Sequence, residues 1–457
     1  MNPPLLIVCL LLVALQFTLP RWWAFLPLLL AACHTPYDSR LVGLSVARIV
    51  ILAGLVRAAS SGSLQLNFRD PFDRWMTFLV GVALLSSVGH ATVLSEPFGF
   101  RCGLVLNIWG SYLYARAYLT TGAVMEQLGI GLVIVLVPFA LMMVIEKLTG
   151  NCPYTLIGAQ NAYSLVRDGK IRAQGVFGTP ILAGTAGACA IPLLISMWRI
   201  RRKLAILGLA SCLIITYCSA SSGPIGTILL GVGAFLLWPC RTSMRQIRIA
   251  AILILVLLQL IKERPIWYLM ALMDFVGGST GWHRAYLMDM GFKHLSEWWL
   301  WGTDYTAHWM PYSLPTTVPG IRQSDMTNYY LHLGVIGGIP LMFCLLAVQW
   351  NSFKHLGRRM LEMRTLGDDR EFSLWCVGVA FFAHSVTFLS ISYFDQMYVF
   401  FWMVVGGLPA LLAAPQDASH PAHDANDEPA FQGLDVHPEC SGYPESRHNL
   451  NSKTNES

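Results

Sequence analysis

The chain has 457 residues, of which 55% are hydrophobic and only 12% are charged. A typical soluble domain has about 25% charged residues, and the mean hydropathy of this chain is +0.53. These values exclude an ordinary cytosolic enzyme. Long apolar runs recur along the whole sequence, so we expect an all-α polytopic membrane protein.

Thirteen apolar segments are candidate transmembrane helices, because about 20 apolar residues cross the hydrocarbon core of a bilayer. They lie near residues 4–20, 22–34, 41–57, 75–95, 98–119, 127–146, 176–198, 204–219, 223–239, 248–266, 326–350, 371–391 and 394–414. Arg21 divides the first apolar stretch into a normal half and a short half. The sequence therefore predicts about 12–13 transmembrane helices.

Three short connections between these segments are rich in basic residues. Residues 199–203 contain four Lys or Arg, residues 241–248 contain three, and residues 354–370 contain five. Basic connections stay on the cytoplasmic side of a membrane. A short segment at about 147–175 and a large loop at 267–325 are then expected on the outer side. The loop separates an N-terminal bundle, 1–266, from C-terminal helices at 326–414.

The C-terminal segment differs from the rest of the chain. Residues 415–457 carry 8 Asp or Glu and 2 Lys or Arg, with almost no large apolar side chains. Such a segment cannot offset the entropy of ordering, so we expect a disordered cytoplasmic tail. Because the remaining basic excess sits at helix ends, the net charge of +5 does not indicate a nucleic-acid partner.

The large outer loop is rich in tryptophan. Six of the fifteen tryptophans are Trp267, Trp282, Trp298, Trp299, Trp301 and Trp309. Tryptophan anchors proteins at the membrane interface, whereas a flat aromatic face also packs against a sugar ring, and both interpretations stay open. An amphipathic helix is expected over 285–299, on the outer membrane face.

Basic residues on the outer side favour an anionic ligand. The arginine fork matches phosphate oxygens in pairs, so Arg172, Arg284 and Arg322 suit a diphosphate. Contact with lipid headgroups is the alternative. The outer segments contain no D-x-D or H-E-x-x-H pattern, and the chain has no Walker loop. We therefore expect neither a metal site nor a cofactor.

Four motifs follow one another in the outer segments: Arg172–Pro180, Thr280–Arg284, Leu300–Thr303 and Thr327–Gly338. The first fits the pattern R-x-x-G-x-F-x-x-P, and the last reads T-N-Y-Y-L with three glycines after it. In this order, the motifs resemble those of the O-antigen ligase and polymerase superfamily. In that family the first motif opens a helix from the periplasmic side, and the others begin, turn and close the large periplasmic loop.

The resemblance implies a GT-C-like fold in the bacterial inner membrane, with residues 267–325 as the periplasmic loop. It implies a metal-independent glycosyltransferase whose donor is a glycan on undecaprenyl diphosphate. The acceptor is a growing polysaccharide or lipid A-core, so the enzyme is a polymerase or a ligase. The sequence does not distinguish these two, nor does it give the oligomeric state.

The resemblance also assigns roles to single residues. The expected catalytic residues are Arg172, Arg284 and His308, and the expected substrate-binding residues are Arg322, Trp301, Thr327 and Asn328. The arginines would contact the diphosphate, and Trp301 and Asn328 the sugar. The family often has a histidine at the position of Thr327, so His308 is the candidate general base instead.

Two other classes of function stay open. A transporter or flippase for a lipid-linked or anionic solute is expected to show inverted repeats of broken helices, and we find no such repeat in the sequence. A non-catalytic membrane scaffold would use the tail to bind partners. Alanine variants of the outer arginines separate the classes, because a scaffold tolerates them.

Overall fold

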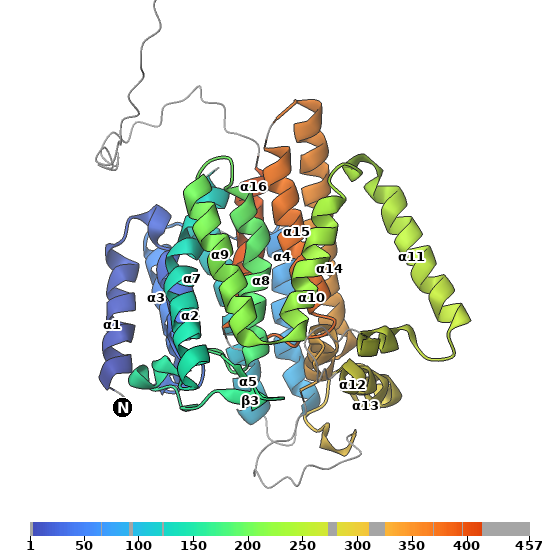
Figure 1. Ribbon diagram of the computed structural model, residues 1–457, viewed down its shortest axis with the longest axis horizontal. Helices are drawn as coiled ribbons and strands as arrows, with labels where there is room; N and C mark the ends of the chain where they lie inside the picture. The colour runs from blue at the N-terminus through green and yellow to red at the C-terminus, as the bar shows by residue number, and fades with distance from the viewer. Residues whose placement is uncertain are drawn as a thin grey trace, which may run out of the picture. The chain divides into compact units, whose positions relative to one another are not determined.

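The computed structural model describes residues 3–64, 66–90, 95–120, 123–272, 281–309, 325–368, 370–394 and 396–413. These residues are mostly helical, in agreement with the predicted all-α class (Figure 1). The predicted tail at 415–457 lies outside the described residues, as does Arg322.

The α-helices vary widely in length. They are α1 (Pro3–Thr18), α2 (Leu26–His34), α3 (Val46–Ser60), α4 (Pro71–Leu85), α5 (Ser95–Val105), α6 (Ser111–Tyr118), α7 (Val124–Thr149), α8 (Pro180–Ser196), α9 (Arg202–Ser219), α10 (Ser222–Leu236), α11 (Met244–Ile261), α12 (Gly281–Lys293), α13 (Leu295–Trp298), α14 (Tyr329–Thr365), α15 (Glu371–Thr387) and α16 (Met397–Leu412). Short helical turns are η1 (Arg21–Trp23), η2 (Ser86–His90), η3 (Leu106–Gly110), η4 (Pro153–Ile157), η5 (Arg241–Ser243), η6 (Ile266–Leu272) and η7 (Ala307–Trp309). Two antiparallel hairpins pair β1 (Arg40–Leu41) with β2 (Leu44–Ser45) and β3 (Leu165–Arg167) with β4 (Lys170–Arg172).

Each of the thirteen predicted apolar segments overlaps a helix. Four helical stretches in the described chain are long and apolar enough to cross a membrane: Val124–Thr149, Arg202–Ser219, Arg241–Ile261 and Tyr329–Thr365. Apolar helices of 10–17 residues accompany them. A membrane protein is thus supported, while the number of spans stays a prediction. The α11 side chains are not buried in the protein, so this apolar helix is suited to contact with lipid.

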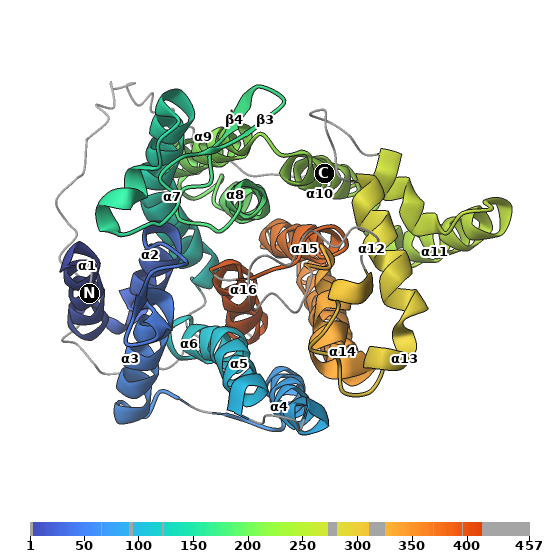
Figure 2. The same ribbon diagram turned by 90° about the horizontal axis from the view of Figure 1, so that it is seen from below.

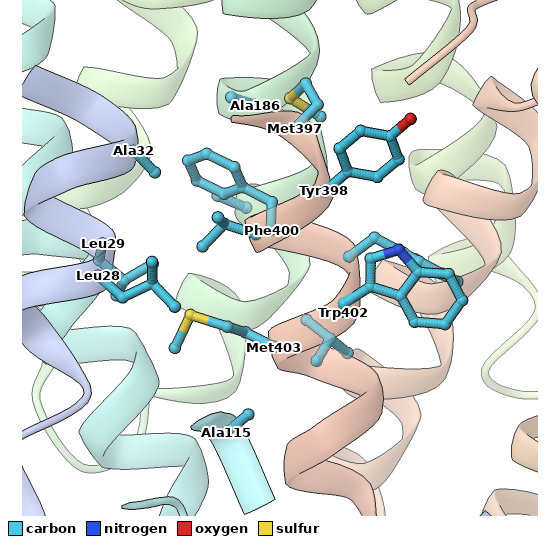
Figure 3. Close-up of a cluster of buried hydrophobic side chains, with 14 of the residues drawn as sticks. Leu28, Leu29, Ala32, Ala115, Ala186, Met397, Tyr398, Phe400, Trp402 and Met403 are labelled. Carbon is cyan, nitrogen blue, oxygen red and sulfur yellow. The ribbon is translucent and has the colours of Figure 1, made fainter. Parts of the chain in front are cut away.

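Helix α16 lies at the centre of the bundle, with α2, α6, α8 and α15 around it (Figure 2). All of its residues from Met397 to Leu408 are buried, as expected for a helix that is apolar on every side. Figure 3 shows Phe400 and Met403 pointing from α16 toward α2. On the α6 side, a Cβ atom on Gly406 would overlap the Tyr112 carbonyl, so glycine permits this close approach.

Helix α14 is broken near its start, and a turn of the preceding loop packs against the break. Gly337 and Gly338 have non-helical backbone angles, with a φ of 77° at Gly338. The Thr303 N–H donates to the Val335 carbonyl at 2.7 Å, and the Ile339 N–H donates to the Trp299 carbonyl at 2.7 Å. These bonds satisfy backbone groups that the broken helix leaves unpaired.

Two helices stand where one amphipathic helix was predicted over 285–299, and the amphipathic character stays a prediction. Helix α12 begins earlier, at Gly281, and ends at Lys293, and the short α13 covers Leu295–Trp298. Trp298 is buried, and its indole N–H donates to the Gly291 carbonyl at 2.7 Å. This contact holds α13 against α12.

Candidate functional site

Arg172 stands at the end of a short hairpin that the sequence analysis did not predict. Strands β3 and β4 are joined by Asp168 and Gly169, whose φ angles are 50° and 71°. Two positive φ angles match the right-handed twist of a hairpin, and Asp-Gly is a preferred sequence for such a turn. The hairpin therefore places Arg172 just before the α8 entry.

The segment after Arg172 is held by a buried carboxylate. Glu146, near the end of α7, accepts hydrogen bonds from the N–H groups of Gln174 at 2.9 Å and Gly175 at 2.8 Å. The Ser164 hydroxyl donates to the same side chain at 2.9 Å. Charge-assisted bonds of this kind are stronger than neutral ones. Glu146 thus fixes the backbone of the R-x-x-G motif.

The Arg172 guanidinium is only partly satisfied by the protein. Its Nη2 donates to the Ser221 hydroxyl at 2.7 Å, in the connection between α9 and α10. Its Nε is buried and has no hydrogen-bond partner in the described part of the chain. Burial lowers the pKa of Arg172, and the nearby charge of Arg167 lowers it further. A partly buried cation with an unused donor is suited to binding an anion.

Arg284 approaches the same region from α12. Its Nε is likewise buried, and no residue that the structure describes forms a hydrogen bond with it. Burial lowers the pKa of Arg284; the charge of Asp325 opposes this, whereas those of Arg167 and Arg172 add to it. The structure therefore brings the charges of Arg172 and Arg284 within interaction range, although they are far apart in the sequence.

Thr327 contributes a third unused donor, next to the Asp325 side chain. Its backbone has a φ of 47°, which is uncommon for a β-branched residue. The Thr327 N–H donates to Asp325 Oδ1 at 2.9 Å, and its hydroxyl is buried without a hydrogen-bond partner within the described ranges. Since Asp325 also interacts with Arg284, the unsatisfied hydroxyl and guanidinium belong to one region.

Both polar atoms of the Asn328 side chain form hydrogen bonds within the protein. Its Oδ1 accepts the Leu331 N–H at 3.0 Å and so caps the start of α14, and its Nδ2 donates to the Leu389 carbonyl at 3.1 Å. Its relative exposure is 3%. The structure thus shows Asn328 as a helix cap, and its predicted contact with a sugar stays a prediction.

A groove of about 1180 Å³ lies between α4, α12, α14 and α15. Its walls are apolar and aromatic, and include Trp75, Phe292, Phe343, Trp350, Phe353 and Phe382. Met288 and Asn328 line it, with the Met288 sulfur 3.7 Å from Asn328 Nδ2. Met288 lies one helical turn after Arg284, so this part of the groove adjoins the arginine region. Further along, basic residues line it: Arg74, Lys354, His355 and Arg358.

His308 belongs to a separate cluster. Its Nε2 lies 3.2 Å from Glu297 Oε1, and His294 Nδ1 lies 2.7 Å from the same oxygen. The Trp309 indole donates to Glu297 Oε2 at 3.0 Å. Burial raises the pKa of Glu297, but the bonds from His294, Trp309 and His308 outweigh it and hold the pKa below its usual range. Their spacing in the sequence did not indicate that these side chains meet.

Trp301 lies in the turn that packs on the α14 break. It contacts η2, because a Cβ atom on Gly89 would overlap its side chain. Its relative exposure of 43% leaves part of the ring accessible, so both predicted roles, sugar contact and membrane anchoring, remain compatible with its position.

Of the predicted site residues, the structure brings together Arg172, Arg284 and Thr327, and places His308 beside Glu297. Glu146 and Ser221, which position Arg172, were not predicted as part of a site. The sequence matches no protein-family model and no curated protein. The resemblance to the O-antigen ligase and polymerase superfamily therefore stays a prediction.

Proposed function

We propose that the protein is a membrane glycosyltransferase that uses a glycan on a polyprenyl diphosphate, of the undecaprenyl type, as its donor. One observation carries the proposal. Arg172 and Arg284 are partly buried, the charge of Arg172 lowers the pKa of Arg284, and each keeps a buried Nε without a hydrogen-bond partner among the described residues. Burying such charges is costly unless an anion compensates them. A diphosphate supplies that charge, with oxygens suited to guanidinium groups.

The arginines act on the leaving group. An acceptor hydroxyl oxygen forms a bond to the anomeric carbon of the donor glycan, while the bond from that carbon to the diphosphate oxygen breaks. The hydroxyl proton leaves to a base, and negative charge develops on the polyprenyl diphosphate. Arg172 and Arg284, fixed in a partly dehydrated site, stabilise that charge. The chemistry assigned to these residues is the same for a growing polysaccharide and for a lipid A-core acceptor.

The groove supports a lipid-linked donor. Its aromatic and aliphatic walls suit an isoprenoid chain. Because Met288 lines the groove one turn from Arg284, a chain in the groove would carry its diphosphate toward the arginines. A soluble sugar nucleotide would leave this groove unused.

The arrangement of the bundle supports a site on the outer face. Figure 1 shows the connections α8–α9, α10–α11 and α14–α15 at one end of the bundle, at the top, and the hairpin, α12 and α13 at the other. The first group carries the basic residues expected on the cytoplasmic side. The proposal therefore includes a multi-pass protein of the bacterial inner membrane with its site on the periplasmic side.

The test is a mass profile of polyprenyl-diphosphate-linked glycans and of surface polysaccharide. Loss of the gene is expected to leave single repeat units on the carrier for a polymerase, and long chains on the carrier for a ligase. Arg284→Ala and Arg172→Ala are expected to reproduce that loss while the protein still inserts into the membrane. Removing one such contact costs on the order of 100-fold in rate.

Arg264→Ala is the matched control, because Arg264 is an exposed arginine before the same loop. It is expected to keep the parental profile. Unchanged pools in the deletion strain, or full activity in both Arg172→Ala and Arg284→Ala, would contradict the proposal and favour a transporter, flippase or scaffold.

A further inference from the structure

Three side chains of metal-ligand type meet on the segment 281–309. His294 follows α12, Glu297 lies in α13 and His308 lies in η7. His294 Nδ1 lies 2.7 Å from Glu297 Oε1, and His308 Nε2 lies 3.0 Å from Glu297 Oε2. One ligand atom from each lies within 4.8 Å of the others. This spacing suits a single ion, because two ligands about 2.1 Å from a tetrahedral ion are roughly 3.4 Å apart.

Neighbouring side chains hold the two imidazole rings in place. The His294 ring stacks on Trp309, with centroids 5.2 Å apart, and the His308 ring stacks on Tyr305, with centroids 5.0 Å apart. Trp309 is buried and also donates its indole N–H to Glu297 Oε2. Outer-shell bonds of this kind orient metal ligands and tune their affinity.

We propose that His294, Glu297 and His308 form a binding site for a divalent transition-metal ion, with zinc as the best match. Two imidazole nitrogens and one carboxylate are a common zinc ligand set. The side chains are 27%, 35% and 38% exposed, respectively, so an ion can enter from solvent and keep a position for water. The sequence contains none of the metal motifs sought above, because these ligands come from two turns of a folded loop.

The ion would cross-link α13 to η7. The chain between Glu297 and His308 contains the turn at 299–303, which packs on the broken start of α14. Metal binding would therefore fix that turn. The inference uses neither Arg172 nor Arg284, so it stands independently of glycosyl transfer. It replaces the role of general base expected for His308, since a metal-bound nitrogen cannot accept a proton.

The test measures binding of Zn²⁺ to the untagged full-length protein in detergent, after treatment with a chelator, by isothermal titration. The parent and every variant carry alanine at the four tail histidines, His420, His423, His437 and His448, because histidine is a common metal ligand. Co²⁺ binding, followed by its visible absorption, reports the geometry of the ligand set.

One zinc ion per chain is expected, with cobalt bands of a site rich in nitrogen and oxygen. Glu297→Gln and His308→Ala should each weaken zinc binding by about 100-fold or more, and Trp309→Phe by about tenfold. The matched control is His283→Ala, because His283 is an exposed histidine on α12 outside the cluster. Its affinity should equal that of the parent.

Two results would overturn the proposal: no zinc uptake by the parent, or equal affinity in the parent, Glu297→Gln and His308→Ala. A second measurement covers variants that fold poorly. Zinc should raise the Tm of the parent and of His283→Ala, because a ligand that binds only the folded state stabilises it. A parent Tm that zinc leaves unchanged would also exclude the site.

Discussion

The carboxylate of Glu146 accepts the backbone N–H of Gly175 at 2.8 Å, although 29 residues separate the two in the sequence. Glu146 lies near the C-terminal end of a helix long enough to span a membrane, and Gly175 lies in the R-x-x-G motif. This bond and its neighbour from Gln174 fix the backbone that carries Arg172. The position of the proposed phosphate-binding arginine therefore depends on a carboxylate.

Glu146→Gln should destabilise the protein and reduce glycan transfer. Glutamine has one acceptor oxygen in place of two, so the buried donors of Gln174, Gly175 and Ser164 are no longer all satisfied. We expect a loss of about 1–3 kcal/mol in the free energy of unfolding, measured by thermal unfolding in detergent. Glu126→Gln is the control on the same helix, because its ion pair with Arg201 is more exposed; it should cost less than about 1 kcal/mol. Equal losses would argue against the role of Glu146.

Gly175→Ala should also displace the motif. Gly175 has a φ of 59°, and an added Cβ would overlap the Phe139 ring. Gly169→Ala is the matched control, since Gly169 has a φ of 71° with no atom within 4 Å of such a Cβ. Backbone strain alone costs about 1–2 kcal/mol, and overlap in a packed region adds about 1–3 kcal/mol. Thermal unfolding of both variants separates these costs. An equal loss of stability in the two would show that the Phe139 ring moves aside for the added Cβ.

The helices were predictable because a membrane requires long apolar segments whose backbone groups are paired within the helix. The sequence also identified Arg172 and Arg284 as candidates for one ligand. The hairpin before Arg172 was missed, although Asp168-Gly169 is a recognisable turn signal.

Other parts of the site could not be found in the sequence. Glu146 reads as an ordinary charge at a helix end, since its partners are 28 and 29 residues away and have no periodic relation to it. Likewise, Glu297 and His308 meet only because the loop between them folds back.

The break in α14 should tolerate no side chain at Gly338. The residue has a φ of 77°, and a Cβ there would overlap the backbone of Leu300, which cannot move aside as a flexible side chain can. Gly338→Ala should therefore lower the Tm and displace the turn that contains Trp301. Gly357→Ala, on the same helix and with nothing within 4 Å of the added Cβ, should raise stability by about 0.5–1 kcal/mol. Thermal unfolding should therefore show a lower Tm for Gly338→Ala and a higher Tm for Gly357→Ala. An unchanged Tm in Gly338→Ala would contradict the observed packing.

A bulky side chain in the groove should reduce glycan transfer without preventing membrane insertion. Ala347 lines the groove, so Ala347→Trp would fill space proposed for the isoprenoid chain. We expect transfer from a long-chain polyprenyl donor to fall about tenfold, equivalent to about 1.4 kcal/mol of lost binding. Transfer from a short-chain donor analogue should fall less. Ala251→Trp on the exposed α11 is the control for membrane insertion and should keep full activity with both donors. Parental rates in Ala347→Trp would remove the groove from the mechanism.

Neutralising one arginine should stabilise the protein while abolishing its response to an anion. Arg284→Gln relieves the repulsion with Arg172 and removes a partly buried charge, so the free energy of unfolding should rise by about 1 kcal/mol without ligand. Inorganic pyrophosphate should raise the Tm of the parent, because it binds the folded state, and should leave the Tm of Arg284→Gln unchanged. Arg264→Gln, at an exposed site, should keep the parental response. A parent that does not respond to pyrophosphate, or a variant that responds equally, would show that the two arginines do not form a diphosphate site.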